Sequence, residues 1–178
     1  MNLLQQVING LSLGSIYALI ALGYTMVYGI IKLINFAHCD IYMIGAYVGY
    51  LCLTTLKIGV LPSLLIAMVV CTVLGILIEK IAYKPLRNAT RIAVLITAIG
   101  VSIFLEYVMM YIFKANVRAY PPMTGWMAKS FHISGLTLTS QQILIFAATV
   151  VLMILLQFTV KKTRIGKAMR AVSLDRDA

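Results

Sequence analysis

Long apolar stretches follow one another along this chain, and short polar loops separate them. A helix that crosses a bilayer needs about 20 mostly apolar residues, and several of these stretches reach that length. No segment of about 10 residues alternates between apolar and polar side chains, as a membrane β-barrel strand would. The pattern therefore predicts an all-α fold, a polytopic membrane helical bundle of about five transmembrane helices in one domain over residues 1–178. The expected spans lie near residues 7–31, 36–56, 58–79, 92–113 and 141–160.

Composition supports the bilayer as the solvent of this chain. Hydrophobic residues make up 62% of the sequence and charged residues only 11%, and the mean hydropathy is +0.98. A soluble domain of this size would carry more charge on its surface. We therefore expect a protein that moves, conducts or anchors something in a membrane.

The positive charges give the expected orientation. The net charge is +10, and the densest basic stretches are residues 80–91 and 161–176. Because lysine and arginine concentrate in cytoplasmic loops, both stretches are expected on the cytoplasmic side, with the N-terminus outside and the C-terminus in the cytoplasm. Their position at the ends of spans favours lipid phosphate as their partner and argues against nucleic acid.

Small residues recur at the spacing of helix contacts. Gly10 and Gly14 form one GxxxG pair, and Gly45 and Gly49 form another. Such pairs let two helix backbones approach closely in a membrane, so these four glycines are expected on helix-packing faces.

Polar residues interrupt the apolar pattern between the first two expected spans. Asn35, Phe36, Ala37 and His38 begin this segment, and Cys39-Asp40 follows. One interpretation is a cytoplasmic turn with interfacial polar side chains. The other is a broken helix that lines a substrate path, because irregular backbone at membrane depth is tolerated only against protein or water. The pattern leaves both interpretations open.

Glu106 lies well inside the expected fourth span. An ionised acid near mid-bilayer costs about 2.5–3.5 kcal/mol on insertion scales, so Glu106 is expected to face protein or water, or to be protonated. A structural hydrogen bond to another helix and a place on a substrate path are both compatible with it.

Motifs for other chemistry are missing from the sequence. No G-x-x-x-x-G-K-[ST] phosphate-binding loop and no cluster with metal-ligand spacing occurs. No nucleophile and base are arranged as in an enzyme active site. We therefore expect no enzyme activity, no metal and no cofactor, which leaves transport or a structural role in a membrane complex.

Several blocks of the sequence have a familiar order and spacing outside the loop at 114–140. They are residues 9–30, 35–38, 42–47, 79–87, 96–102 and 163–171. These blocks, in this order, closely resemble LivH-type permeases, the inner-membrane subunits of bacterial ABC importers for branched-chain amino acids.

The resemblance implies a transport function in a bacterial inner membrane. Such a permease pairs with a second related permease, two ATP-binding subunits and a periplasmic substrate-binding protein that delivers leucine, isoleucine or valine. ATP binding and hydrolysis then drive alternating access. The resemblance places an ATPase coupling segment near the end of the sequence, at Gly166, Arg170, Asp175, Asp177 and Ala178.

Two features depart from the family pattern. Cys39 follows the Asn-Phe-Ala-His block where family members usually carry glycine, and the sequence ends within the coupling segment at Ala178. We therefore expect an N-terminal portion of such a permease, inactive alone. The alternatives are a stand-alone channel or ion-coupled carrier for a small solute such as urea or an amide, and a scaffold subunit that does not transport.

Overall fold

The computed structural model describes residues 3–31, 34–86, 89–122, 129–133 and 136–174. Helices dominate these residues, as the pattern predicted, and the chain divides into two compact units. One unit contains residues 1–32 and 122–178, and the other contains residues 33–121. Each unit is described separately.

Four helices among the described residues are long and apolar enough to cross a membrane: Leu3–Gly29, Val60–Leu86, Ile92–Phe113 and Ser140–Lys162. The stretch expected as a span at 36–56 forms α2, which covers His38–Thr54 and has 17 residues. This helix is shorter than expected because residues 34–37 leave the helical path before it begins. The all-α membrane bundle is confirmed, with one helix at the lower length limit for a span.

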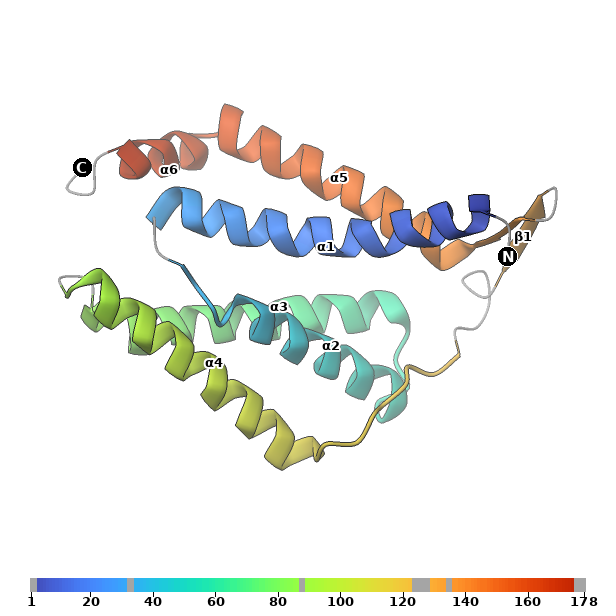
Figure 1. Ribbon diagram of the computed structural model, residues 1–178, viewed down its shortest axis with the longest axis horizontal. Coiled ribbons are helices and arrows are strands. Elements are labelled where there is room, and N and C mark those ends of the chain that lie inside the picture. Colours follow the sequence, from blue (N-terminus) through green and yellow to red (C-terminus); the bar gives the residue numbers. More distant parts are fainter. Residues whose placement is uncertain (1–2, 32–33, 87–88, 123–128, 134–135, 175–178) are drawn as a thin grey trace. The chain divides into compact units, whose positions relative to one another are not determined.

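The first unit pairs the first and last long helices. Helix α1 (Leu3–Ile31) lies beside α5 (Ser140–Lys162), and the short helix α6 (Arg164–Leu174) packs against both (Figure 1). At the other end of α1, strands β1 (Ser130–Ile133) and β2 (Leu136–Thr139) form an antiparallel hairpin in which Ser130 pairs with Thr139. The sequence pattern did not predict this hairpin.

Amide side chains join the hairpin to the two long helices. Gln5 on α1 accepts a hydrogen bond from the backbone N–H of Thr137 (2.8 Å) and donates one to its carbonyl (2.9 Å). Gln142 completes a capping box with Thr139 at the start of α5, and it also donates to Asn9 on α1 (3.0 Å). These bonds satisfy the exposed donors of a helix N-terminus and fix the hairpin at this end.

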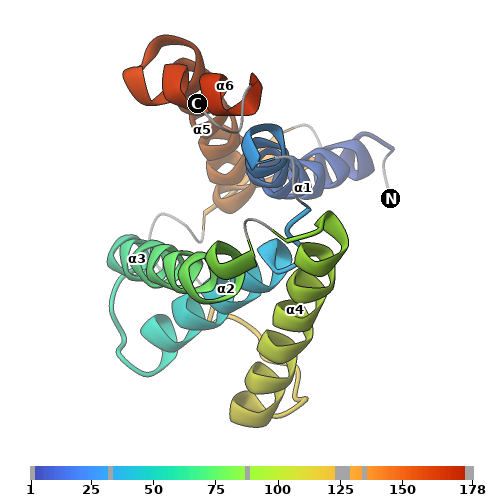
Figure 2. The ribbon, with the colours of Figure 1, turned by 90° about the vertical axis from the view of Figure 1, so that its left-hand side faces the viewer.

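The described residues of the second unit form three α-helices. Helix α2 packs along α3 (Val60–Ile78), and α4 (Arg91–Phe113) contacts α2 and runs at a steep angle to α3 in Figure 2. Helix α3 continues into a π-helical turn, η1 (Glu79–Tyr83), and a 3₁₀ turn, η2 (Lys84–Leu86). Thr90 caps α4 by accepting a hydrogen bond from the Ala93 N–H.

An aromatic cluster fixes the segment after α4 against α2. The Tyr120 hydroxyl donates to the Ala46 carbonyl (2.6 Å), and its ring meets the Tyr50 ring edge-on at 6.0 Å. The Arg118 guanidinium lies 5.8 Å from the centre of the Tyr50 ring and 5.6 Å from that of Phe113. Burial, and then the neighbouring Tyr42, raise the pKa of Tyr120 above its ordinary value. The phenol therefore stays a hydrogen-bond donor over a wider pH range.

Candidate functional site

The polar segment before α2 places one residue, Ala37, in the core of its unit. Ala37 is completely buried, and it forms a cluster with Ile78 at the end of α3 and Leu105 on α4. Ile41 and Tyr83 pack against this cluster. Close packing of Ala37 against two helices fixes the position of this segment within its unit.

Asn35 is bonded to the π-helical turn. The Tyr83 hydroxyl donates to the Asn35 side-chain oxygen at 2.7 Å. Residues wound as a π-helix are rare and occur often at functional sites. Here the turn covers Glu79–Tyr83, and Tyr83 is its last residue. The turn therefore presents the phenol that holds the polar segment.

Asp40 forms the second polar contact of this segment. Its side chain is only 5% exposed, and Ser102 on α4 donates a hydrogen bond to its Oδ2 atom at 2.5 Å. Asp40 also lies in the first turn of α2, where the helix dipole favours a negative charge. A buried carboxylate needs such compensation because removing it from water is costly. We call residues 34–40 with Tyr83 and Ser102 the clamped segment.

The structure brings together only some of the residues that the sequence singled out. Asn35, Ala37 and His38 lie in the clamped segment, with His38 as the first residue of α2. Phe36 is 44% exposed. Glu106 is also exposed, and it makes no hydrogen bond or ion pair with any described residue. Its place on a path therefore stays a prediction.

Tyr83 and Ser102 were not singled out by sequence reasoning. Both lie within blocks that carry the family resemblance, 79–87 and 96–102, but a tyrosine or a serine in an apolar helix gives no signal of its own. The partners are 48 and 62 residues apart along the chain. Only the folded arrangement shows that they meet.

The four glycines of the two GxxxG pairs differ in how closely other atoms approach them. A Cβ atom on Gly45 would lie 2.8 Å from the Cys71 sulfur of α3, and one on Gly49 would lie 3.0 Å from the Tyr120 oxygen. These two positions therefore permit close packing. A Cβ atom on Gly10 or Gly14 would meet nothing within 4 Å, so their packing role stays a prediction.

The expected coupling segment begins with α6. A Cβ atom on Gly166 would lie 2.2 Å from the Val160 carbonyl oxygen and 2.3 Å from that of Thr159, so only glycine fits this position. The Gly166 N–H donates to the Thr163 hydroxyl at 3.0 Å, and Arg170 donates to the Lys161 carbonyl at 3.4 Å. The tight turn therefore folds α6 back against the end of α5. Asp175, Asp177 and Ala178 lie outside the described residues.

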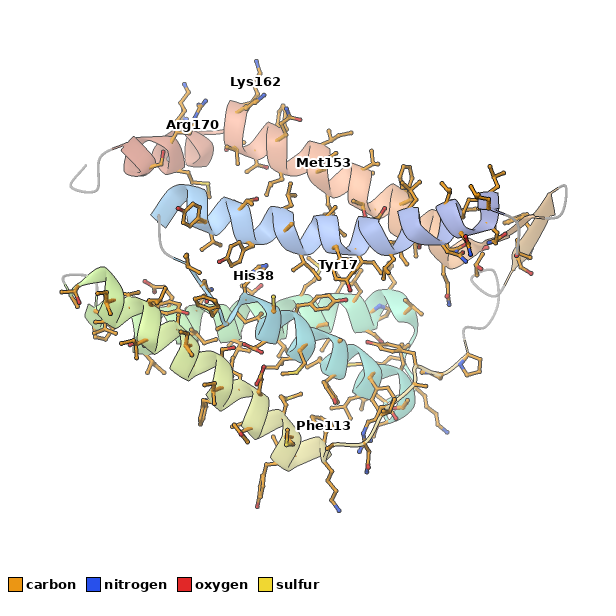
Figure 3. All side chains as sticks on the ribbon, in the orientation of Figure 1. Tyr17, His38, Phe113, Met153, Lys162 and Arg170 are labelled. Atoms are coloured by element: carbon orange, nitrogen blue, oxygen red, sulfur yellow. The ribbon has the colours of Figure 1, made fainter. Side chains whose placement is uncertain are left out.

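A cavity of about 280 Å³ lies where α6 meets α1 and α5. The wall is mainly apolar, and Thr25, Arg170 and Ser173 are its polar side chains. Lys162 at the end of α5 and Arg170 on α6 lie at this end of the unit (Figure 3). The apolar side chains that line the cavity are Leu22, Met26, Leu156, Val160 and Met169.

Metal-ligating side chains are dispersed. Within the ranges that the structure describes, no three histidine, cysteine, aspartate or glutamate side chains gather closely enough to hold an ion. Cys39 is exposed, Cys52 is buried and Cys71 lies half-buried beside Gly45. The three thiols therefore give no ligand set among themselves.

Comparison with known proteins identifies the family. Residues 6–178 match the family model described as branched-chain amino acid transport system / permease component. The chain is 41% identical over 182 aligned positions to the high-affinity branched-chain amino acid transport system permease protein BraD of Pseudomonas aeruginosa, with 97% of this chain and 59% of that protein covered. The corresponding LivH proteins are 41% identical in Salmonella typhimurium and 40% identical in Escherichia coli K12, with the same coverage.

The chain thus spans about three fifths of the length of the curated relatives it matches. No solved structure matches it. The family match covers nearly the whole chain, and four of the described helices, α1, α3, α4 and α5, are long and apolar enough to cross a bilayer. The chain is therefore a multi-pass protein of the bacterial inner membrane, and it belongs to the family of permease components of branched-chain amino acid transport systems.

Proposed function

We propose that this chain is a permease subunit of an ABC importer that moves leucine, isoleucine and valine across the inner membrane. The observation that carries the proposal is the family match over residues 6–178, joined to a polytopic helical fold. Relatives with 40–41% identity are named as permease proteins of high-affinity branched-chain amino acid transport systems. The protein itself performs no catalysis in this proposal.

Other subunits supply the energy and the substrate. The proposed complex contains a second related permease, two ATP-binding subunits and a periplasmic substrate-binding protein. ATP binding and hydrolysis in the separate subunits switch the permease between outward-facing and inward-facing states. The N-terminus lies outside and the C-terminus in the cytoplasm, as the basic stretches indicate.

The clamped segment is our candidate for part of the substrate path. Asn35, Ala37 and the start of α2 are held by Tyr83, Ser102 and the core cluster, so the segment keeps a fixed shape. Phe36 and Glu106 are exposed on this unit, which leaves both available to face a path completed by other subunits. Irregular backbone next to the start of a helix is a feature that many membrane transporters use at their binding sites.

Helix α6 and the residues after it are the proposed coupling segment. Gly166 and Arg170 set the angle at which α6 leaves α5, because one permits the close approach and the other bonds the last turn of α5. In this proposal Asp175, Asp177 and Ala178 belong to the same coupling segment. Movement of that subunit would then reach α5 and α1 through this turn.

The stand-alone carrier is the weaker alternative. An ion-coupled carrier needs charges within the membrane that face one another along a path. Glu106, the acid inside α4, makes no ion pair with any residue that the structure describes. This arrangement favours a permease that is driven by its partners. The experiment below therefore also measures transport of urea.

A hybrid permease tests the proposal directly. Residues 6–178 would replace the matching part of BraD, and the hybrid would be reconstituted in liposomes with the second permease, both ATP-binding subunits and the binding protein. We expect labelled leucine uptake that requires ATP and the binding protein, and none from this chain alone. Leucine uptake without ATP, or uptake of labelled urea but not of leucine, would contradict the proposal.

A further inference from the structure

The cavity between α1, α5 and α6 combines an apolar wall with one cationic side chain. Leu22, Met26 and Leu156 line its interior, and Arg170 is its only charged residue among those described. Its two hydroxyl groups already donate to their own helices, Thr25 to the Leu22 carbonyl and Ser173 to the Arg170 carbonyl. Arg170 is therefore the lining side chain with donors left for a ligand.

No acidic side chain among the described residues of this unit balances the positive charge around the cavity. Five cations follow one another in a stretch of ten residues, from 161 to 170. Residues 3–31, 122, 129–133 and 136–174, the described part of this unit, contain no aspartate or glutamate. Arg170 uses one guanidinium nitrogen to bond the Lys161 carbonyl, and no other described residue accepts a hydrogen bond from its remaining donors. The five cations are Lys161, Lys162, Arg164, Lys167 and Arg170.

Three of these cations, Arg164, Lys167 and Arg170, lie on α6, and they are divided between two of its faces. Gly166, Met169, Arg170 and Ser173 follow helical spacing, and they face α5 or the cavity. The opposite face contains the exposed side chains of Arg164, Lys167, Ala168 and Ala171. An anion in the cavity would therefore meet Arg170 and leave the opposite face free.

We propose that this cavity binds an anionic phospholipid, with its phosphate at Arg170 and part of an acyl chain against Leu22, Met26, Leu156 and Met169. The volume of about 280 Å³ is close to the lower end of the range for ligand pockets, about 300–1,000 Å³, so it accommodates one chain segment. Basic pockets between membrane helices at the cytoplasmic surface are suited to lipid headgroups. A free anion would leave the apolar wall unused.

The site would fix the angle of α6 in a lipid-dependent way. A headgroup on Arg170 neutralises the charged side chain of the cavity, and the acyl chain fills the cavity where α6 meets α1 and α5. This proposal does not require the transport function. It concerns the face of α6 that is turned toward α1 and α5.

Native mass spectrometry of the full chain in detergent tests the site. The protein would be given an equimolar mixture of phosphatidylglycerol and phosphatidylcholine, and the ratio of the two lipids that stay bound would be measured. We expect phosphatidylglycerol to be preferred. Arg170→Gln should lower that preference about fivefold, since a lysine or arginine near a lipid surface contributes about 1 kcal/mol.

Three further variants distinguish a defined lipid site from general charge attraction. Arg164→Gln removes a cation from the opposite face of α6 and should leave the preference unchanged. Leu156→Trp fills the apolar end of the cavity without changing any charge, and it should also reduce the bound lipid. Thr25→Trp fills the cavity from α1 and serves if the first filler disturbs folding, which circular dichroism would show.

Either of two outcomes overturns the proposal. Equal losses from Arg164→Gln and Arg170→Gln would mean that the whole basic stretch attracts lipid without a defined site. Undiminished phosphatidylglycerol in both folded cavity-filling variants would mean that the acyl chain does not enter the cavity.

Discussion

The Ser102 hydroxyl on α4 lies 2.5 Å from the Oδ2 atom of Asp40 on α2, and this bond joins two helices across the second unit. It is also the hydrogen bond that compensates a carboxylate only 5% exposed. The loss of such a donor is more costly than the loss of a surface hydrogen bond, because the acceptor stays buried.

Ser102→Ala is therefore expected to lower the free energy of unfolding by about 1.5–3 kcal/mol, the usual contribution of a hydrogen bond to a charged group. Denaturant unfolding in detergent, followed by circular dichroism, measures the change. Ser12→Ala is the matched control, since Ser12 on α1 makes no hydrogen bond with any described residue. Equal effects of the two variants would show that the Asp40 contact contributes nothing.

A double variant tests whether the unpaired Asp40 carboxylate causes the loss of stability in Ser102→Ala. Asp40→Leu in the Ser102→Ala background removes the buried carboxylate together with its lost donor. Replacement of both partners by apolar groups of similar shape is close to neutral. The double variant should thus be more stable than Ser102→Ala alone, and a lower stability would contradict the argument.

Tyr83→Phe removes the hydroxyl that bonds Asn35 and keeps the ring in the core cluster. We expect a loss of about 0.5–1.5 kcal/mol and faster hydrogen exchange at the amides of residues 34–40. Tyr111→Phe is the control, because Tyr111 is 89% exposed. Unchanged exchange in Tyr83→Phe would mean that the packing of Ala37 alone holds the segment.

The sequence predicted the helices better than the site. Uncharged stretches of sufficient length locate α1, α3, α4 and α5, because the bilayer permits few other structures. The clamped segment was recognised as unusual at Asn35 and Asp40, but its partners Tyr83 and Ser102 depend on how three helices pack. The hairpin at 130–139 depends on side chains of α1 and α5, such as Gln5, that no local pattern reveals.

Lys114 adopts a backbone conformation that favours glycine. Its φ is 60° and its ψ is 171° where α4 ends. Such a conformation costs a side-chain-bearing residue about 1–3 kcal/mol, so Lys114→Gly is expected to raise the melting temperature. Lys129→Gly serves as the control and should lower it slightly, since Lys129 does not have a positive φ and glycine adds freedom to the unfolded chain. A lower melting temperature for Lys114→Gly would contradict the prediction.

The hydrogen bond from the Tyr120 hydroxyl to the Ala46 carbonyl should be lost at alkaline pH. Because burial raises the pKa of Tyr120, the neutral phenol is favoured in the folded chain, and its contribution to stability is complete below the ordinary tyrosine pKa of about 10. This contribution is lost as the pH rises through the higher folded pKa. Phenolate absorption during a pH titration measures the step, which Tyr120→Phe should remove. A step at the ordinary pKa would show that the phenol is not protected.

The direction in which α6 leaves α5 depends on Gly166. A Cβ atom there would lie 2.2 Å from a backbone oxygen at the end of α5, and the backbone cannot rotate away as a side chain can. Gly100 on α4 is the matched control, because a Cβ atom at that position meets nothing within 4 Å. Alanine also favours helix over glycine by about 1 kcal/mol, so Gly100→Ala should be neutral or stabilising.

Gly166→Ala is therefore expected to push α6 away from α5, at a cost of about 1–3 kcal/mol typical of overpacking. Hydrogen exchange at residues 164–174 should become faster in this variant, while Gly100→Ala leaves it unchanged. In the hybrid permease the same variant should reduce ATP-driven leucine uptake, because the coupling segment would leave α5 at a different angle. Wild-type exchange and wild-type uptake in Gly166→Ala would together show that the close approach of α6 to α5 is not needed for folding or for coupling.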